Sequence, residues 1–77
     1  MTFLEPRDDF DGCIVGICYT EDRAVYDLDL VIKALMASNS FNEDEAEEWF
    51  YSNVERSAAY QDSPPIFMRK EFDLEEL

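Results

Sequence analysis

Blocks of apolar and polar positions predict strands near the start and the end of the chain. Residues 13–19 (Cys-Ile-Val-Gly-Ile-Cys-Tyr) form an uncharged, β-branched run that is typical of a buried strand. Gly16 within this run indicates a bulge or a close backbone approach. Residues 24–26 predict a second strand, and the connection between them is so short that an antiparallel hairpin is expected. Residues 66–68 (Ile-Phe-Met) predict a third strand that joins the hairpin.

Two helices are predicted between the second and third strands. The first runs over residues 28–37, with Asp27 as its N-cap, because the apolar side chains recur at Leu28, Val31, Ile32 and Leu35. The second runs from residue 43 to residue 57 or 58. Asn42 and Glu45 have the spacing of a capping box at its start. The resulting order is β-β-α-α-β, a small α+β domain in which a short antiparallel sheet carries both helices on one face.

The length of 77 residues predicts a single domain covering residues 1–77. Within it, residues 1–12 are expected to be an irregular N-terminal arm, from which Phe3, Leu4 and Phe10 can dock on the rest. Residues 13–69 form the body, and residues 70–77 form an acidic tail. Trp49 and Phe50 share the apolar face of the second helix, where core packing is the ordinary role of such side chains.

The charge of the chain narrows the functions that it can have. It carries 19 Asp and Glu, six Lys and Arg and no His, for a formal net charge of -13. Such a chain repels nucleic-acid phosphates and anionic membranes, so neither is expected as a direct partner. Without His, no His-based triad and no imidazole metal ligand is available. A cofactor or metal site is therefore not expected, and neither is a secretory signal or a membrane span.

The two cysteines, Cys13 and Cys18, are expected to be reduced thiols in a cytosol. On a strand, residues five apart face opposite sides and lie about 16 Å apart, too far for a disulfide unless the strand folds back. No basic residue adjoins either thiol, and catalytic carboxylates would need a buried cleft for which so short a chain has little room. We therefore expect no enzyme activity.

The ordered set of motifs resembles small acidic proteins encoded by tailed bacteriophages. The matching segments are Ile14-Val15-Gly16, Val25-Tyr26-Asp27-Leu28, Glu45-Ala46-Glu47-Glu48-Trp49-Phe50, Asn53-Val54 and Pro65-Ile66-Phe67. The chain departs from that pattern at residues 55–60, where the family has Gly-Ala-aromatic-Val-Gly, and at Ser63-Pro64. The resemblance implies a phage origin, action in the bacterial host cytoplasm and a fold, but no catalytic residues.

The densest charged feature is a run of five carboxylates within residues 43–48. Acids at a helix N-terminus are ordinarily explained by the helix dipole, and surface helices are ordinarily charged. Carboxylates spread over a helix and the tail can also imitate a nucleic-acid backbone and occupy a groove lined by Lys and Arg. The predicted partner-binding residues are Glu43, Asp44, Glu47, Glu48, Trp49, Asp73, Glu75 and Glu76.

These observations lead to the hypothesis of an inhibitor that binds a basic, nucleic-acid-handling host protein, of the anti-CRISPR or another anti-defence type. It would occlude the nucleic-acid groove of that protein by charge mimicry. The alternative is a non-catalytic accessory or structural module that forms a homodimer through an apolar patch. The candidate patch residues are Trp49, Phe67, Phe72 and Leu77.

Overall fold

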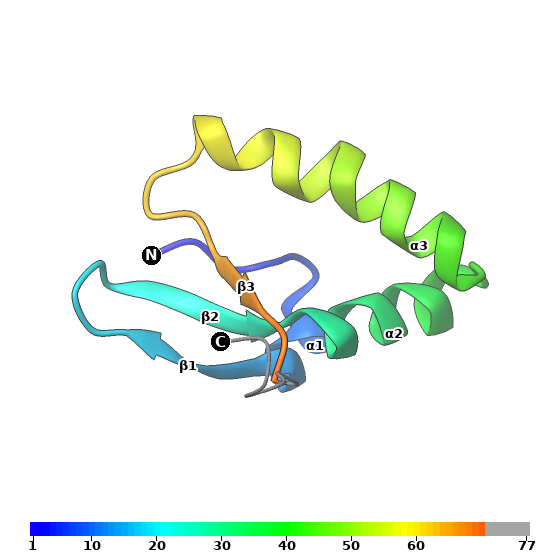
Figure 1. The fold of residues 1–77 in the computed structure, drawn as a ribbon, viewed down its shortest axis with the longest axis horizontal. Helices are drawn as coiled ribbons and strands as arrows, with labels where there is room; N and C mark the ends of the chain where they lie inside the picture. Colours follow the sequence, from blue (N-terminus) through cyan, green and yellow to red (C-terminus); the bar gives the residue numbers. More distant parts are fainter. Residues whose placement is uncertain (71–77) are drawn as a thin grey trace, which may run out of the picture.

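The computed structural model describes residues 1–70 and has the predicted α+β class and the order β-β-α-α-β (Figure 1). A short helix and a 3-10 turn precede the first strand. In chain order, the elements are α1 (Arg7–Phe10), η1 (Asp11–Cys13), β1 (Ile14–Cys18), β2 (Arg23–Asp27), α2 (Leu28–Asn39), α3 (Glu43–Phe50), η2 (Tyr51–Glu55), η3 (Arg56–Tyr60) and β3 (Ile66–Met68).

The sheet is mixed, so the prediction of a purely antiparallel sheet is wrong. Its strand order is β1-β2-β3, with β1 antiparallel and β3 parallel to β2. Figure 1 shows the reason: α2 continues in the direction of β2, and α3 runs back beside it. Two antiparallel helices return the chain to the side where β2 starts, so β3 must run in the same direction as β2.

The strand β1 lies at an edge of the sheet and is not buried as predicted. Val15 is 39% exposed and Ile17 is 51% exposed. The pairing with β2 shifts register between Ile14 and Gly16, which agrees with the bulge that Gly16 indicates. A Cβ atom placed on Gly16 would meet nothing within 4 Å, so this glycine does not serve a close backbone approach.

Both helix starts follow from their capping residues. Oδ1 of Asp27 accepts hydrogen bonds from the backbone N–H groups of Asp29 and Leu30, at 3.0 and 3.3 Å. At α3 the predicted capping box forms. Asn42 accepts from the N–H of Glu45 at 2.8 Å, and Glu45 accepts from the N–H of Asn42 at 2.9 Å. These bonds satisfy N–H groups that have no partner within the helix.

Both helices end later than predicted. α2 reaches Asn39 and stops where Ser40 adopts a left-handed conformation, with φ of 56°. α3 continues through the π-helical turn η2 and the 3-10 turn η3 to Tyr60. Polar side chains inside this extension bond back to the preceding turn, as Asn53 donates to the Trp49 carbonyl at 2.9 Å.

The core joins α2, α3, the sheet and the N-terminal segment. Phe50 of α3 meets Phe67 of β3 edge-on, with ring centroids 4.7 Å apart, and Phe67 lies beside Tyr26 of β2. Through these contacts α3 packs on the sheet, whereas α2 packs mainly against α3 and the N-terminal segment. The buried apolar side chains are Phe10, Cys13, Ala24, Tyr26, Val31, Ile32, Leu35, Ala46 and Phe50.

The N-terminal segment is an integral part of this core: the expected docking of Phe3, Leu4 and Phe10 is confirmed, but the expectation of an irregular arm is wrong for residues 7–12, which are helical. It contains α1, buries Phe10, and packs Phe3 and Leu4 against the core. The backbone N–H of Leu4 donates to the Tyr26 hydroxyl at 2.9 Å. Burial raises the pKa of that hydroxyl. A domain this small gains core volume by using its N-terminal residues.

Candidate partner-binding surface on α3

The predicted acidic residues of α3 project into solvent. Glu43, Asp44, Glu47 and Glu48 are all exposed, and within residues 1–70 none forms an ion pair. Four of the six Lys and Arg residues instead pair with acids outside α3. The neighbouring Glu45 holds the capping box, so its carboxylate is committed to the helix start. The exposed carboxylates of α3 therefore keep their charge available for a partner.

The helix dipole explains only part of this acidic run. Its stabilisation of negative charge falls off beyond the first turn of a helix. Glu43 and Asp44 lie in the first turn of α3, whereas Glu47 and Glu48 lie in the second. The second pair therefore has no such structural role to account for it.

The four carboxylates wrap around α3 and do not lie in one plane. Glu43 and Glu47 line a groove between α3 and α2. Glu48 lines a different hollow on the opposite flank of α3. Asp44 lies between these two flanks, because each residue turns the helix by about 100°. The four span about 140° of the circumference of α3, so a partner that contacts all four must reach from the groove across the outer face of the helix.

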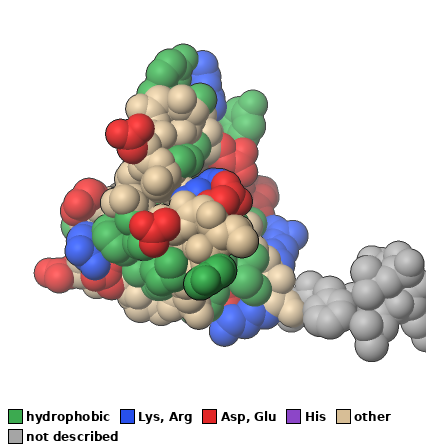
Figure 2. Space-filling model, turned by 90° about the vertical axis from the view of Figure 1, so that its left-hand side faces the viewer, with side chains coloured by type: hydrophobic (Ala, Val, Ile, Leu, Met, Phe, Trp, Pro, Cys, Tyr) green, Lys and Arg blue, Asp and Glu red, His purple; other side chains and the backbone are tan. Residues whose placement is uncertain are grey.

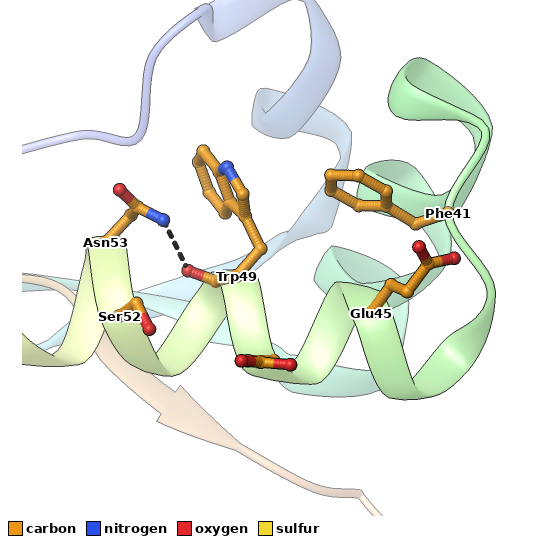
Figure 3. Close-up of a pocket in the computed structure, with 6 residues that line it drawn as sticks. Phe41, Glu45, Trp49, Ser52 and Asn53 are labelled. Atoms are coloured by element: carbon orange, nitrogen blue, oxygen red, sulfur yellow. Dashed lines mark hydrogen bonds between the residues drawn. The ribbon is translucent and has the colours of Figure 1, made fainter.

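The hollow on the Glu48 side contains Trp49, the predicted aromatic anchor (Figure 3). It is open and has a volume of about 320 Å³. The rings of Phe41 and Trp49 stand on the same side of α3, at the two ends of the hollow. Trp49 is half-buried and packs against the core, so it offers only part of its ring to a partner. The sequence left open whether Trp49 packs in the core or binds a partner, and its position in the structure allows both.

Three predicted residues, Asp73, Glu75 and Glu76, lie outside the described residues. Two further residues extend the α3 surface and were missed. Tyr51 is 60% exposed, and Glu55 is exposed on η2. Glu55 follows Tyr51 by four residues and Glu47 by eight, and all three line one hollow, so this spacing could have revealed both missed residues.

The two thiols are free and differ in environment. Cys13 is buried, and burial raises its pKa. Cys18 is partly exposed at the end of β1, and a hydrogen-bonding contact with the Thr20 hydroxyl at 3.6 Å lowers its pKa. The more reactive thiol is therefore Cys18.

Comparison with protein-family models, with curated proteins and with solved structures finds no match. Among residues 1–70, no group of three acidic or Cys side chains is placed to hold a metal ion. None of the helices in this part of the chain has the length and apolar character needed to cross a membrane.

Proposed function

We propose that this chain is a phage-encoded inhibitor acting in the bacterial host cytoplasm. It binds a basic, nucleic-acid-handling host protein, of the anti-CRISPR or another anti-defence type, and occludes its nucleic-acid groove. The observation that carries this proposal is the set of four exposed carboxylates, Glu43, Asp44, Glu47 and Glu48, on a helix that is fixed by a capping box.

The charge density of α3 supports mimicry of nucleic acid. Residues 43–48 span about 7.5 Å of helix axis, so the four carboxylates give about one charge per 2 Å. Duplex DNA carries about one charge per 1.7 Å of its axis. The net charge of -13 adds long-range attraction that steers the chain to a positive groove. Lys and Arg side chains of a nucleic-acid site can therefore accept α3 in place of phosphates.

The test is capture of host proteins on the tagged chain, followed by measurement of affinity for the protein retrieved. We expect a basic nucleic-acid-binding protein whose binding to the chain weakens steeply with salt and is mutually exclusive with DNA or RNA. E43K/D44K/E47K/E48K should weaken binding by about tenfold or more, equivalent to about 1.4 kcal/mol. Binding that is insensitive to salt, or that persists alongside bound nucleic acid, would contradict the proposal.

A matched pair of variants separates the α3 surface from net charge. E43Q/D44N/E47Q/E48Q and E5Q/D8N/D22N/D62N remove the same number of charges, but the second set lies outside α3. Asn also suits the positive φ of 54° at residue 22. The first variant should lose most of the affinity and the second little. Equal losses of affinity would show that only the net charge of the chain matters, and not the position of the carboxylates on α3.

A homodimer is a second candidate, favoured by the exposed edge strand. Trp49 and Phe67, two of the predicted patch residues, are half-buried against the core, while Phe72 and Leu77 lie outside the described residues. Three of the seven exposed large apolar side chains within residues 1–70 lie instead on β1 and the turn after it, at Val15, Ile17 and Tyr19.

Figure 2 faces the end of the molecule that carries the β1–β2 turn, where carboxylates lie at separate points among apolar and cationic side chains. An uncharged edge strand can pair with that of a second copy. Light scattering over a range of concentrations tests this candidate. A dimer that I17K converts to monomer supports it, and a monomer at all concentrations overturns it.

A further inference from the structure

A groove with an apolar floor runs between α2 and α3. One hollow, of about 280 Å³, is floored by Ile32 and Met36. A second hollow, of about 210 Å³, is floored by Leu28, Ile32 and Phe50. Ile32 and Glu47 line both hollows, so the two form one continuous groove. Its floor on α2 follows from spacing, because Leu28, Ile32 and Met36 are four residues apart and lie in one row.

Carboxylates dominate the rim of this groove. The acidic residues that line it are Asp29, Glu43, Glu47 and Glu55, and the cationic ones are Lys33 and Arg69. Arg69 forms an ion pair with Asp29, with Nε 3.6 Å from Oδ1. The remaining rim acids, Glu43, Glu47 and Glu55, form no ion pair within residues 1–70, and together with Asp29 they outnumber the two cations of the rim. A matching occupant has an apolar stripe flanked by Lys and Arg.

We infer that the groove binds an amphipathic, basic helix of the partner protein. Figure 1 shows α2 and α3 running antiparallel, and a third helix packs readily into the groove of such a pair. From Leu28 to Met36 the floor extends about 12 Å along α2, enough for two to three turns of a docked helix. Tyr51, which lines the same groove and is 60% exposed, offers a ring to its apolar stripe.

This inference rests on the proposed function and makes it more specific. In this arrangement α3 contacts the partner in two ways. Its exposed carboxylates attract the partner electrostatically, and the groove holds the apolar stripe of the partner's helix. The acidic tail of the chain is a poor alternative occupant, because residues 71–77 contain four acids and no cation. Like charges on the rim and the tail would repel each other.

The test uses a fluorescein-labelled synthetic peptide of 14 Leu and Lys residues in helical amphipathic order. A peptide of the same composition in scrambled order is its control. Fluorescence anisotropy with the full chain should show binding of the amphipathic peptide that is at least about fivefold tighter than that of the scrambled one. Amide chemical-shift changes should concentrate on α2, α3 and Tyr51.

Variants of the chain test whether the peptide binds in the groove. E43Q/E47Q should weaken it about fivefold, whereas D8N/D62N, with the same change of charge outside the groove, should change it less than twofold. Y51A should weaken it about fivefold without loss of folding, because Tyr51 is exposed. K33E should tighten peptide binding, because it replaces a cation in the hollow of Glu43 and Glu47 with a further acid.

Equal effects of the two charge pairs, equal binding of the scrambled peptide, or shifts spread over the whole surface would overturn the inference. The proposed function would survive each of these results, because mimicry requires exposed carboxylates on α3 and does not require a helix bound in the groove. Conversely, the peptide could bind specifically in the groove while the chain fails to compete with nucleic acid for the host protein. That result would contradict the proposed inhibitor and support the groove as a binding site.

Discussion

The strand β1 contains no charged residue, whereas α3 carries a carboxylate at five of its eight positions. The burial of their most buried and most exposed apolar side chains runs the other way. Val15 and Ile17 of β1 are 39% and 51% exposed, but Ala46 and Phe50 of α3 are 0% and 4% exposed. β1 is an edge strand, while α3 lies against both α2 and the sheet. The comparison teaches that position in the fold, and not average hydrophobicity, decides which segment supplies the core.

The largest expected effect tests the inner face of α3. F50A should lower the free energy of unfolding by about 3–5 kcal/mol, because it removes a buried ring that packs edge-on against Phe67. The adjacent Y51A should change it by less than about 0.5 kcal/mol, because Tyr51 is exposed. Urea denaturation followed by circular dichroism measures both. Similar losses would mean that α3 does not divide into a buried and an exposed face.

The next effect concerns how so acidic a helix begins. N42A removes the side chain that accepts from the Glu45 N–H, and should cost about 1 kcal/mol. N42S keeps an oxygen at this position and should retain most of the stability. Urea midpoints compare the two variants with the wild type. If N42A and N42S were equally stable, the capping box would not hold α3.

A smaller effect tests the exposure of β1. V15T should change the free energy of unfolding by less than about 0.5 kcal/mol. The same substitution at the fully buried Val31 should cost about 1–3 kcal/mol, because it buries a hydroxyl without a prepared partner. Thermal and urea unfolding of the two variants measure both changes in stability. A larger loss from V15T than from V31T would show that β1 is covered in solution.

The smallest perturbation compares the thiol of Cys13, just before β1, with that of Cys18, at the end of β1. Iodoacetamide should label Cys18 before Cys13 in the folded protein, as read by mass spectrometry of peptides. The lowered pKa of Cys18 gives more thiolate at a given pH, whereas burial raises the pKa of Cys13 and shields it. T20A should slow labelling of Cys18 by raising its pKa, and T20S should not. Faster labelling of Cys13 would contradict this assignment.

Local signals in the sequence predicted most of the elements. The N-cap Asp27, the capping box at Asn42 and Glu45, the hairpin and the bulge near Gly16 were all predicted, and the structure confirms them. Each depends on residues close together in the chain, so the information needed lies within a short window. The exposed acids of α3 were predicted for the same reason, because helical spacing placed them off the face that carries Ala46 and Phe50.

The features that were mispredicted all depend on contacts between distant residues. The parallel direction of β3 follows from the return path of two helices, and the edge position of β1 follows from the strand order, in which β2 is its one neighbour within residues 1–70. The helical N-terminal segment is fixed by the Tyr26 hydroxyl, 22 residues away from Leu4. The division of the acids between a groove and a hollow also required the placement of α2 beside α3.

The sequence by itself determined the number and kind of most elements, the caps of α2 and α3, and the acidic character of the surface, because propensity, hydrogen bonding within a turn and charge are local properties. Only the tertiary structure decided which apolar residues are covered, how the third strand runs and where an apolar groove lies beside the carboxylates. Those outcomes depend on which surfaces meet once the chain has folded, and no short stretch of residues contains that information.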